Sequence, residues 1–336
     1  MGVASPAAPR KQRAGFQQSL RGRIADPLFR LVLTGLAGLV LVILIFFFVF
    51  LISKARPALA HEGVIDFVFR NDWSPGTNVF RAWPLLVGTL ITAATALVIG
   101  VPVAVTTAVF IAEYAPRRLA AALTILTELL AAVPSIVYGL WGALVLIPEL
   151  LTTQQSLSDR LSFMPFVGGM VAGPSYFLAG LILAIMILPI VCAISREVIQ
   201  TVPTESKEAA MALGATRWEV VRSVILPYSR AGIVGASMLG MGRAVGETIA
   251  VVLVIGNSPM IGHSIFDQGY TLASVIVNEF GEAAGDDLKS GALIAAGLVL
   301  FVLTLLINGV ARALVMRAER RRFRDNHVVA SDGVTL

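Results

Sequence analysis

The composition is that of a membrane protein. Hydrophobic residues make up 57% of the 336 residues and charged residues only 14%, which excludes a soluble domain. The net charge of +5 comes from basic residues concentrated in loops and tails, so nucleic acid is not an expected partner. The single cysteine, Cys192, excludes an internal disulfide. The three histidines lack ligand spacing, so a metal site is not expected. No cofactor is expected on this chain either.

Apolar runs along the chain predict an all-α, polytopic fold with six membrane-spanning helices. Residues 1–30 read as a cytoplasmic tail, and the run that follows is too long for a signal-peptide core. The predicted transmembrane domain covers 31–315, and a basic cytoplasmic tail covers 316–336. The expected spans are 31–53, 84–112, 119–147, 176–195, 231–257 and 291–311.

Local signals refine this outline. Pro84 is well placed to open the second span, and Pro134 predicts a kink in the third. Residues 148–175 are expected to form a loop, and residues 271–281 show an amphipathic pattern. Glu128, early in the third span, adds a charge at membrane depth whose partner the sequence does not identify.

The loops differ in Lys and Arg content, which predicts their orientation. One side of the membrane carries 19 of these residues and the other carries 6, with Arg243 inside a span. Because basic residues are retained on the cytoplasmic side, both termini and the 196–230 segment are expected there. The basic tails then face the anionic lipid of the inner leaflet.

The fifth predicted span contains two charges, Arg243 and Glu247, within the sequence Gly240 to Thr248. In a continuous helix Arg243 lies about 18 Å into a hydrocarbon core about 30 Å thick. A charge there costs about 2.5–3.5 kcal/mol on insertion scales, so Arg243 needs protein or water around it. A stripe of small residues beside it predicts close packing against another helix. This stripe is Gly232, Ala236, Gly240, Ala244 and Thr248.

Three interpretations of the pair are open from the residues. Arg243 and Glu247 stand at positions i and i+4, so they could neutralise each other, although an acid before a base is the better order. Alternatively, they form an anion site or gate on a transport pathway. In the third interpretation, one of them pairs with a different helix.

The segment between the fourth and fifth spans predicts two short helices at an angle. Thr204 is expected to cap the first and Thr216 the second, with Gly214 as a left-handed stop between them. Trp218 on the second helix suits a docking knob for a separate protein. The alternative is an amphipathic hairpin lying on lipid headgroups. The chain has no Gly-Lys dipeptide and therefore no phosphate-binding P-loop of its own.

This segment resembles the E-A-A loop of bacterial ABC-importer permeases. The matching residues are Glu208, Ala209, Ala210, Gly214, Leu226 and Pro227, with Trp218 between them. Within that group the sequence resembles the PstC family of phosphate-import permeases over residues 30–315. Three stretches carry the likeness: 242–248, 132–142 and 72–75.

The resemblance implies a type I (MetI-like) importer fold without an ATPase site on this chain. It implies a PstA-like permease partner, a dimer of PstB-like ATPases that hold ATP and Mg, and a PstS-like phosphate-binding protein. The 204–227 loop would couple to the ATPase. Arg243, Glu247 and Thr248 would line the path of inorganic phosphate through the bacterial cytoplasmic membrane.

Several alternatives accompany this resemblance. Glu247 would accept a hydrogen bond from the proton of monohydrogen phosphate, hold Arg243 in place, or bridge to the partner subunit. A PstA-type sister subunit or a sulfate or molybdate permease is the runner-up within ABC importers. A secondary transporter would not need the 204–227 loop, and a membrane enzyme would need a nucleophile and base that the sequence does not show.

Overall fold

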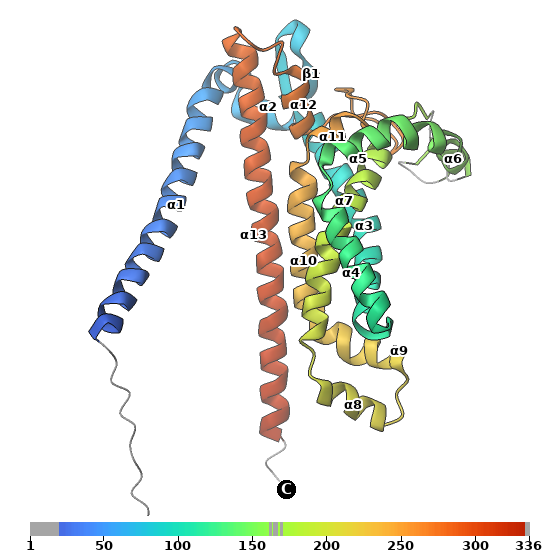
Figure 1. Cartoon of the computed structure of the whole chain (residues 1–336). Coiled ribbons are helices and arrows are strands. Elements are labelled where there is room, and N and C mark those ends of the chain that lie inside the picture. The colour runs from blue at the N-terminus through green and yellow to red at the C-terminus, as the bar shows by residue number, and fades with distance from the viewer. Residues whose placement is uncertain (1–19, 161–162, 164–166, 169–170, 333–336) are drawn as a thin grey trace, which may run out of the picture. The chain divides into compact units, whose positions relative to one another are not determined.

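The computed structural model describes residues 20–160, 163, 167–168 and 171–332 (Figure 1). The described backbone divides into two units, with the boundary between Phe50 and Leu51. The described part of the first unit is one helix, the beginning of α1 (Leu20–Glu62). Residues 1–19 and 333–336 of the predicted tails lie outside the described residues. The rest of both tails is helical, since α1 begins at Leu20 and α13 (Asp287–Asp332) continues through the C-terminal segment.

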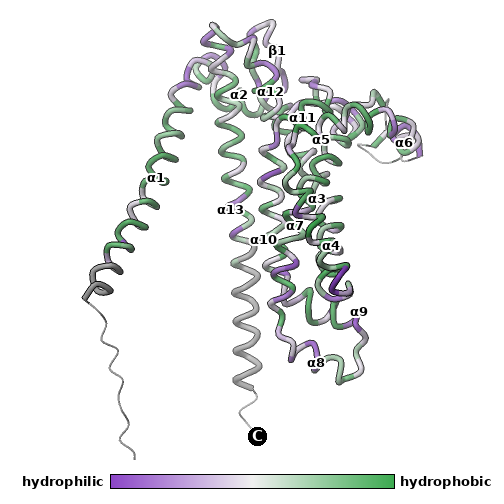
Figure 2. The backbone as a smooth tube through the Cα atoms, viewed as in Figure 1, coloured by the Kyte–Doolittle hydropathy of each residue, from purple (hydrophilic) through white to green (hydrophobic). Residues whose placement is uncertain are grey.

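Six helices in the described part of the chain are long and apolar enough to cross a membrane, which confirms the predicted number (Figure 2). They cover Pro27–Glu62, Trp83–Tyr114, Ser135–Arg160, Tyr176–Gln200, Arg217–Gly246 and Asp287–Ala313. The described fold is almost entirely helical, with one small two-stranded sheet.

One end of the second unit is built around a β-hairpin. The short helix α2 (Val64–Phe69) leads into β1 (Asn71–Ser74), a 3₁₀ turn (Pro75–Thr77) and the antiparallel strand β2 (Val79–Ala82). Trp73 on β1 is 2% exposed, and its ring lies edge-on to Phe67 and Phe80. Its indole nitrogen Nε1 donates to both carboxylate oxygens of Glu279, at 3.1 Å each. Glu279 ends α12 (Leu272–Glu279), so this bond ties the hairpin to that helix.

The core of the second unit is formed by three long helices. They are α3 (Trp83–Val109), α7 (Tyr176–Gln200) and α10 (Leu226–Gly246). Their facing sides carry many alanines and glycines, so the backbones approach closely without needing large side chains between them. Pro84 stands in the first turn of α3, where its missing N–H costs nothing. A five-residue π-helical turn, η2 (Phe110–Tyr114), extends α3.

The third predicted span is not one helix. Helix α4 (Arg117–Ala132) ends before an extended Val133 and Pro134, and α5 (Ser135–Trp141) begins after them. A residue before proline is disfavoured in the helical region, and proline has no N–H to donate, so the expected kink is a complete break. The prediction of a loop over residues 148–175 is also wrong in its first part, which is helical. A π-helical turn, η3 (Gly142–Leu146), leads into α6 (Ile147–Arg160), whose Gln154 accepts a hydrogen bond from Ser175.

Candidate functional site

The fifth span is also interrupted, within the stretch that carries its charges. The sequence predicts a helix through 231–257, but α10 ends at Gly246 and Glu247 is extended, with φ −72° and ψ 133°. A short helix, α11 (Ile249–Val252), follows. Glycine is a poor helix former, and the stretch contains Gly240, Gly242 and Gly246, so the helix is weakest there. The prediction of one continuous span was therefore wrong.

Polar side chains satisfy backbone groups that the break releases. The hydroxyl of Thr248 donates to the carbonyl of Gly246 at 3.2 Å. The carboxylate of Glu247 accepts from the backbone N–H of Ala250 at 3.4 Å. Because Glu247 is not helical, the expected i,i+4 geometry with Arg243 does not exist. The ion pairs among the described residues do not include one between these two side chains.

Arg243 lies on the exposed side of α10, while Glu247 and Thr248 are half-buried. The small-residue stripe from Gly232 to Ala244 faces the other way, toward α7, whereas Thr248 lies beyond the end of α10. A Cβ atom added at Gly240 would lie 2.8 Å from a methyl of Val191, and Ala236 and Ala244 are buried. The helical part of the stripe therefore forms the predicted packing seam, and Arg243 stands outside it.

A tyrosine that the sequence analysis did not single out lies at the break in the third span. Pro134 leaves the carbonyl of Leu130 without its usual helical donor, and the hydroxyl of Tyr138 donates to that carbonyl at 2.9 Å. Tyr138 is 8% exposed and lies within electrostatic range of Arg243. Its signal in the sequence is its position four residues after the proline, one turn beyond the break.

The two interrupted spans meet directly. Helix α5 packs on α11, and the closest approach is at Gly139, where an added Cβ would lie 2.9 Å from the Cα of Ala250. The break at Pro134 and the break after Gly246 thus lie in neighbouring segments of the bundle. Irregular backbone at membrane depth is tolerated where it lines protein or a cavity, and it is a common setting for substrate sites in transporters.

The predicted two-helix element is present at the end of the unit remote from the hairpin (Figure 1). It consists of α8 (Thr204–Ala212), α9 (Arg217–Val220) and a π-helical turn, η4 (Val221–Ile225). Thr204 is wrong as the first cap, because the preceding Pro203 holds the cap position and Thr204 is already helical. Gly214 has φ +90°, the left-handed conformation expected for it. Thr216 caps α9 in a reciprocal capping box with Glu219.

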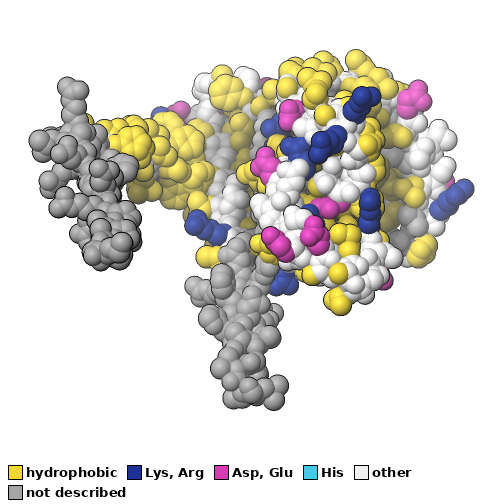
Figure 3. All heavy atoms as spheres, turned by 60° about the horizontal axis from the view of Figure 1, so that its bottom comes forward, with side chains coloured by type: hydrophobic (Ala, Val, Ile, Leu, Met, Phe, Trp, Pro, Cys, Tyr) yellow, Lys and Arg dark blue, Asp and Glu magenta, His cyan; other side chains and the backbone are white. Residues whose placement is uncertain are grey.

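Apolar side chains project from this element. Trp218 is 61% exposed and Leu213 is 91% exposed. Leu213 was missed by the sequence analysis, although an apolar residue directly before a left-handed glycine stands at the tip of a turn. Of the motif residues, Glu208, Ala209 and Pro227 are exposed, whereas Ala210 and Leu226 are half-buried. Charged side chains of both signs gather on this end of the unit (Figure 3).

Residues 100–320 match the family model described as binding-protein-dependent transport system inner membrane component. The matched region contains the broken third and fifth spans and the whole 204–227 element. This class of protein is the membrane component of an importer that works with a separate binding protein.

Full-length relatives narrow the assignment. The chain is 39% identical to a "Phosphate transport system permease protein PstC" of Xylella fastidiosa, covering 95% of this chain and 99% of the relative. It is 42% identical to the PstC of Mesorhizobium japonicum, covering 90% and 93%. It is 44% identical to "PstC 2" of Mycobacterium tuberculosis, covering 87% and 92%. The chain belongs to the PstC family of phosphate transport system permeases.

Solved structures with the same fold are more distant. One is a bacterial ABC transporter involved in the import of the acidic polysaccharide alginate, with a TM-score of 0.54 and 16% identity, covering 87% of this chain and 99% of that one. Another is a bacterial alginate ABC transporter in complex with an alginate pentasaccharide-bound periplasmic protein, with a TM-score of 0.55 and 17% identity, covering 87% and 98%. The fold is that of a type I ABC importer permease.

Proposed function

We propose that this chain is the permease subunit of an ATP-driven importer that moves inorganic phosphate across the bacterial cytoplasmic membrane. The observation that carries the proposal is the exposed guanidinium of Arg243, beside two interrupted spans, in a chain whose full-length relatives are named for phosphate transport. A lone cation at this depth needs a counter-charge, and a passing anion supplies it.

The planar guanidinium suits phosphate because it offers paired hydrogen bonds to two oxygens. A single arginine also keeps the site weak, which transport requires, since a tight site would trap the ion. Tyr138 and Thr248 place hydroxyl groups near the two breaks and help to keep this region polar.

Glu247 is proposed to select for the protonated anion. Its carboxylate is held by the N–H of Ala250 and not by Arg243, so one oxygen stays available to accept a hydrogen bond from monohydrogen phosphate. Sulfate has no such proton near neutral pH. If Glu247→Gln leaves both the uptake rate and the preference for phosphate over sulfate unchanged, this role of Glu247 is wrong.

The partners follow from the fold and the family. A PstA-like permease would complete the pathway next to Arg243, and a PstS-like protein would deliver phosphate at the hairpin end. A dimer of PstB-like ATPases, which bind ATP and Mg, would receive the exposed Trp218 and Leu213. The termini and the 204–227 element would then be cytoplasmic, consistent with the Lys and Arg distribution.

The test is to reconstitute the complex with its binding protein in liposomes and to measure uptake and ATP hydrolysis with phosphate or with sulfate. Phosphate should stimulate hydrolysis and enter, whereas sulfate should do neither. Arg243→Gln should lower uptake at least about tenfold, because a charge-assisted hydrogen bond contributes about 1.5–3 kcal/mol. Arg230→Gln, an exposed arginine near the start of the same helix, is the matched control and should transport normally.

Stimulation by sulfate instead of phosphate would assign the complex to the alternative oxyanion class. Full phosphate uptake by Arg243→Gln would show that the arginine has a structural role only.

A further inference from the structure

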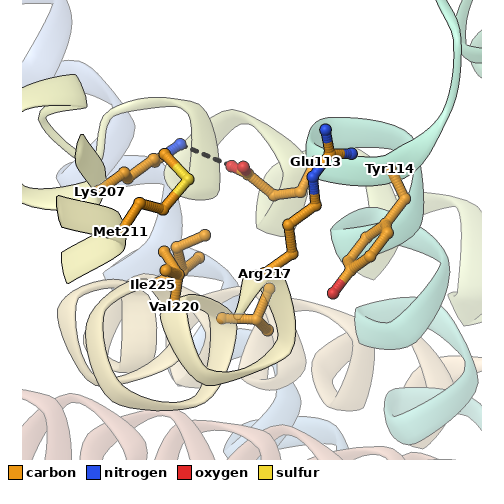
Figure 4. Close-up of a pocket in the computed structure, with 8 residues that line it drawn as sticks. Glu113, Tyr114, Lys207, Met211, Arg217, Val220 and Ile225 are labelled. Atoms are coloured by element: carbon orange, nitrogen blue, oxygen red, sulfur yellow. Dashed lines mark hydrogen bonds and ion pairs between the residues drawn. The ribbon is translucent and has the colours of Figure 1, made fainter. Parts of the chain in front are cut away.

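One ion pair joins the 204–227 element to a membrane-spanning helix. The Lys207 ammonium Nζ on α8 lies 2.6 Å from the Glu113 carboxylate Oε1 on η2, the turn that extends α3 (Figure 4). The two side chains are 18% and 20% exposed. Because water screens such a pair less than a surface salt bridge, the attraction between its two charges is stronger.

Helix α8 has few other ties to the bundle. None of its residues is buried, and its packing partners are α9 and η4. A cavity of about 230 Å³ separates it from the end of α3. Its lining includes both members of the ion pair, together with Met211 and Arg217. The ion pair spans one side of this space (Figure 4).

The connection continues inward through rigid elements. Turn η2 is continuous with α3, and α3 packs along α7 and α10, the helix that carries Arg243. Among the described residues, the other ion pairs all lie at the hairpin end, between residues 61 and 81. Within that part of the chain, Lys207–Glu113 is therefore the direct charged link between the cytoplasmic element and a span.

We propose that the Lys207–Glu113 ion pair is a positioning link that transmits movement of α8 to the inner end of the second span. The inference rests on the proposed function, because the movement is that of a docked ATPase. Without the ion pair, α8 would move into the cavity and α3 would stay in place. ATP hydrolysis would then continue while transport fails.

The experiment uses the complete reconstituted complex and measures phosphate uptake and ATP hydrolysis on the same vesicles. Lys207→Glu and Glu113→Lys should each lower the ratio of phosphate imported to ATP hydrolysed about tenfold, equivalent to about 1.4 kcal/mol of lost coupling. The double variant with both changes restores an attractive pair and should recover the ratio. A general loss of structure would lower assembly and hydrolysis as well, and the exchanged pair would not reverse it.

Two further variants complete the design. Arg230→Gln removes an exposed positive charge that lies outside the 204–227 element and should leave the ratio unchanged. Lys207→Gln removes the charge without adding repulsion, so it can test the ion pair even if the complex with Lys207→Glu does not assemble. A normal ratio in Lys207→Gln, or a double variant as uncoupled as the single ones, overturns the link. Failure of the unmodified complex to import phosphate would instead refute the proposed function.

Discussion

At the scale of single residues, Tyr138 shows how a side chain compensates for a broken backbone. Pro134 cannot donate to the carbonyl of Leu130, which accepts a 2.9 Å bond from the Tyr138 hydroxyl and a longer one, 3.4 Å, from the N–H of Val133. The same side chain lies within electrostatic range of Arg243. Tyr138 thus makes a structural hydrogen bond and also belongs to the surroundings of the proposed anion path.

Removing that hydroxyl should be measurable. Tyr138→Phe leaves the Leu130 carbonyl without this donor, and the purified protein should lose about 1 kcal/mol of stability. Thermal unfolding in detergent is the measurement. Tyr114→Phe, at an exposed tyrosine, is the control and should stay within about 0.5 kcal/mol of the unmodified protein. Equal midpoints for the two variants would show that the Tyr138 bond contributes nothing.

A second residue-scale effect concerns pH. Burial raises the pKa of the Glu279 carboxyl above its ordinary value, although the bond from Trp73 works in the opposite direction. A folded-state pKa above the unfolded value of about 4.3 means that the folded protein binds the proton more tightly. This contribution to stability is complete below that unfolded value and is lost as the pH rises through the folded-state pKa.

Glu279→Gln should remove this dependence. The amide oxygen can still accept from Trp73, but it does not titrate between about pH 4 and pH 7. The melting temperature of the unmodified protein should therefore fall relative to that of the variant as the pH is raised over this interval. Parallel curves for the two proteins would mean that Glu279 does not titrate differently in the folded and unfolded states.

At the scale of elements, the sequence predicted the helices well and their interruptions poorly. Six apolar runs and the capped helix after Thr216 follow from local patterns, and both were found. The break after Gly246 depends on tertiary contacts, namely the packing of α11 on α5 and of α10 on α7. Hydropathy depends only on the residues of the segment itself and not on these contacts, so it predicts one span over residues 231–257. Pro134 correctly indicated where the third span is interrupted, but the sequence predicted a kink there and not a complete break.

The same limit applies to the candidate site. Arg243 and Glu247 could be selected because charges are rare at membrane depth. Tyr138 and Leu213 could not be selected in this way, because aromatic and apolar residues are common in such a chain. The Lys207–Glu113 pair joins residues 94 positions apart, so no local pattern contains it.

The contact between α5 and α11 gives a prediction about two elements. A methyl group at Gly139 would lie 2.9 Å from the Ala250 backbone and 2.8 Å from a methyl of Leu253, so the helices would have to separate. Gly139→Ala should cost about 1–3 kcal/mol, the usual range for overpacking. Gly235→Ala in α10 meets nothing within 4 Å and should be neutral or slightly stabilising. Thermal unfolding of both variants distinguishes close packing from a general effect of alanine.

At the scale of the whole chain, the distribution of basic residues predicts which end faces the cytoplasm. The 204–227 element carries Lys207, Arg217 and Arg222 and belongs to the side with 19 basic residues. The hairpin and α12 belong to the side with 6. The structure places these two groups at opposite ends of the second unit (Figure 1), so a single topology accounts for both.

Cysteine labelling tests this topology directly. Cys192 is buried, and Cys192→Ser provides a background without cysteine. Single cysteines are then placed at Gly281, in the exposed turn after α12, and at Leu213, at the tip of the opposite element. A membrane-impermeant maleimide should label Gly281→Cys from the outer side of the intact membrane, and Leu213→Cys only after the membrane is opened. The reverse pattern would place the 204–227 element outside, where no ATPase could dock, and would refute the proposed importer.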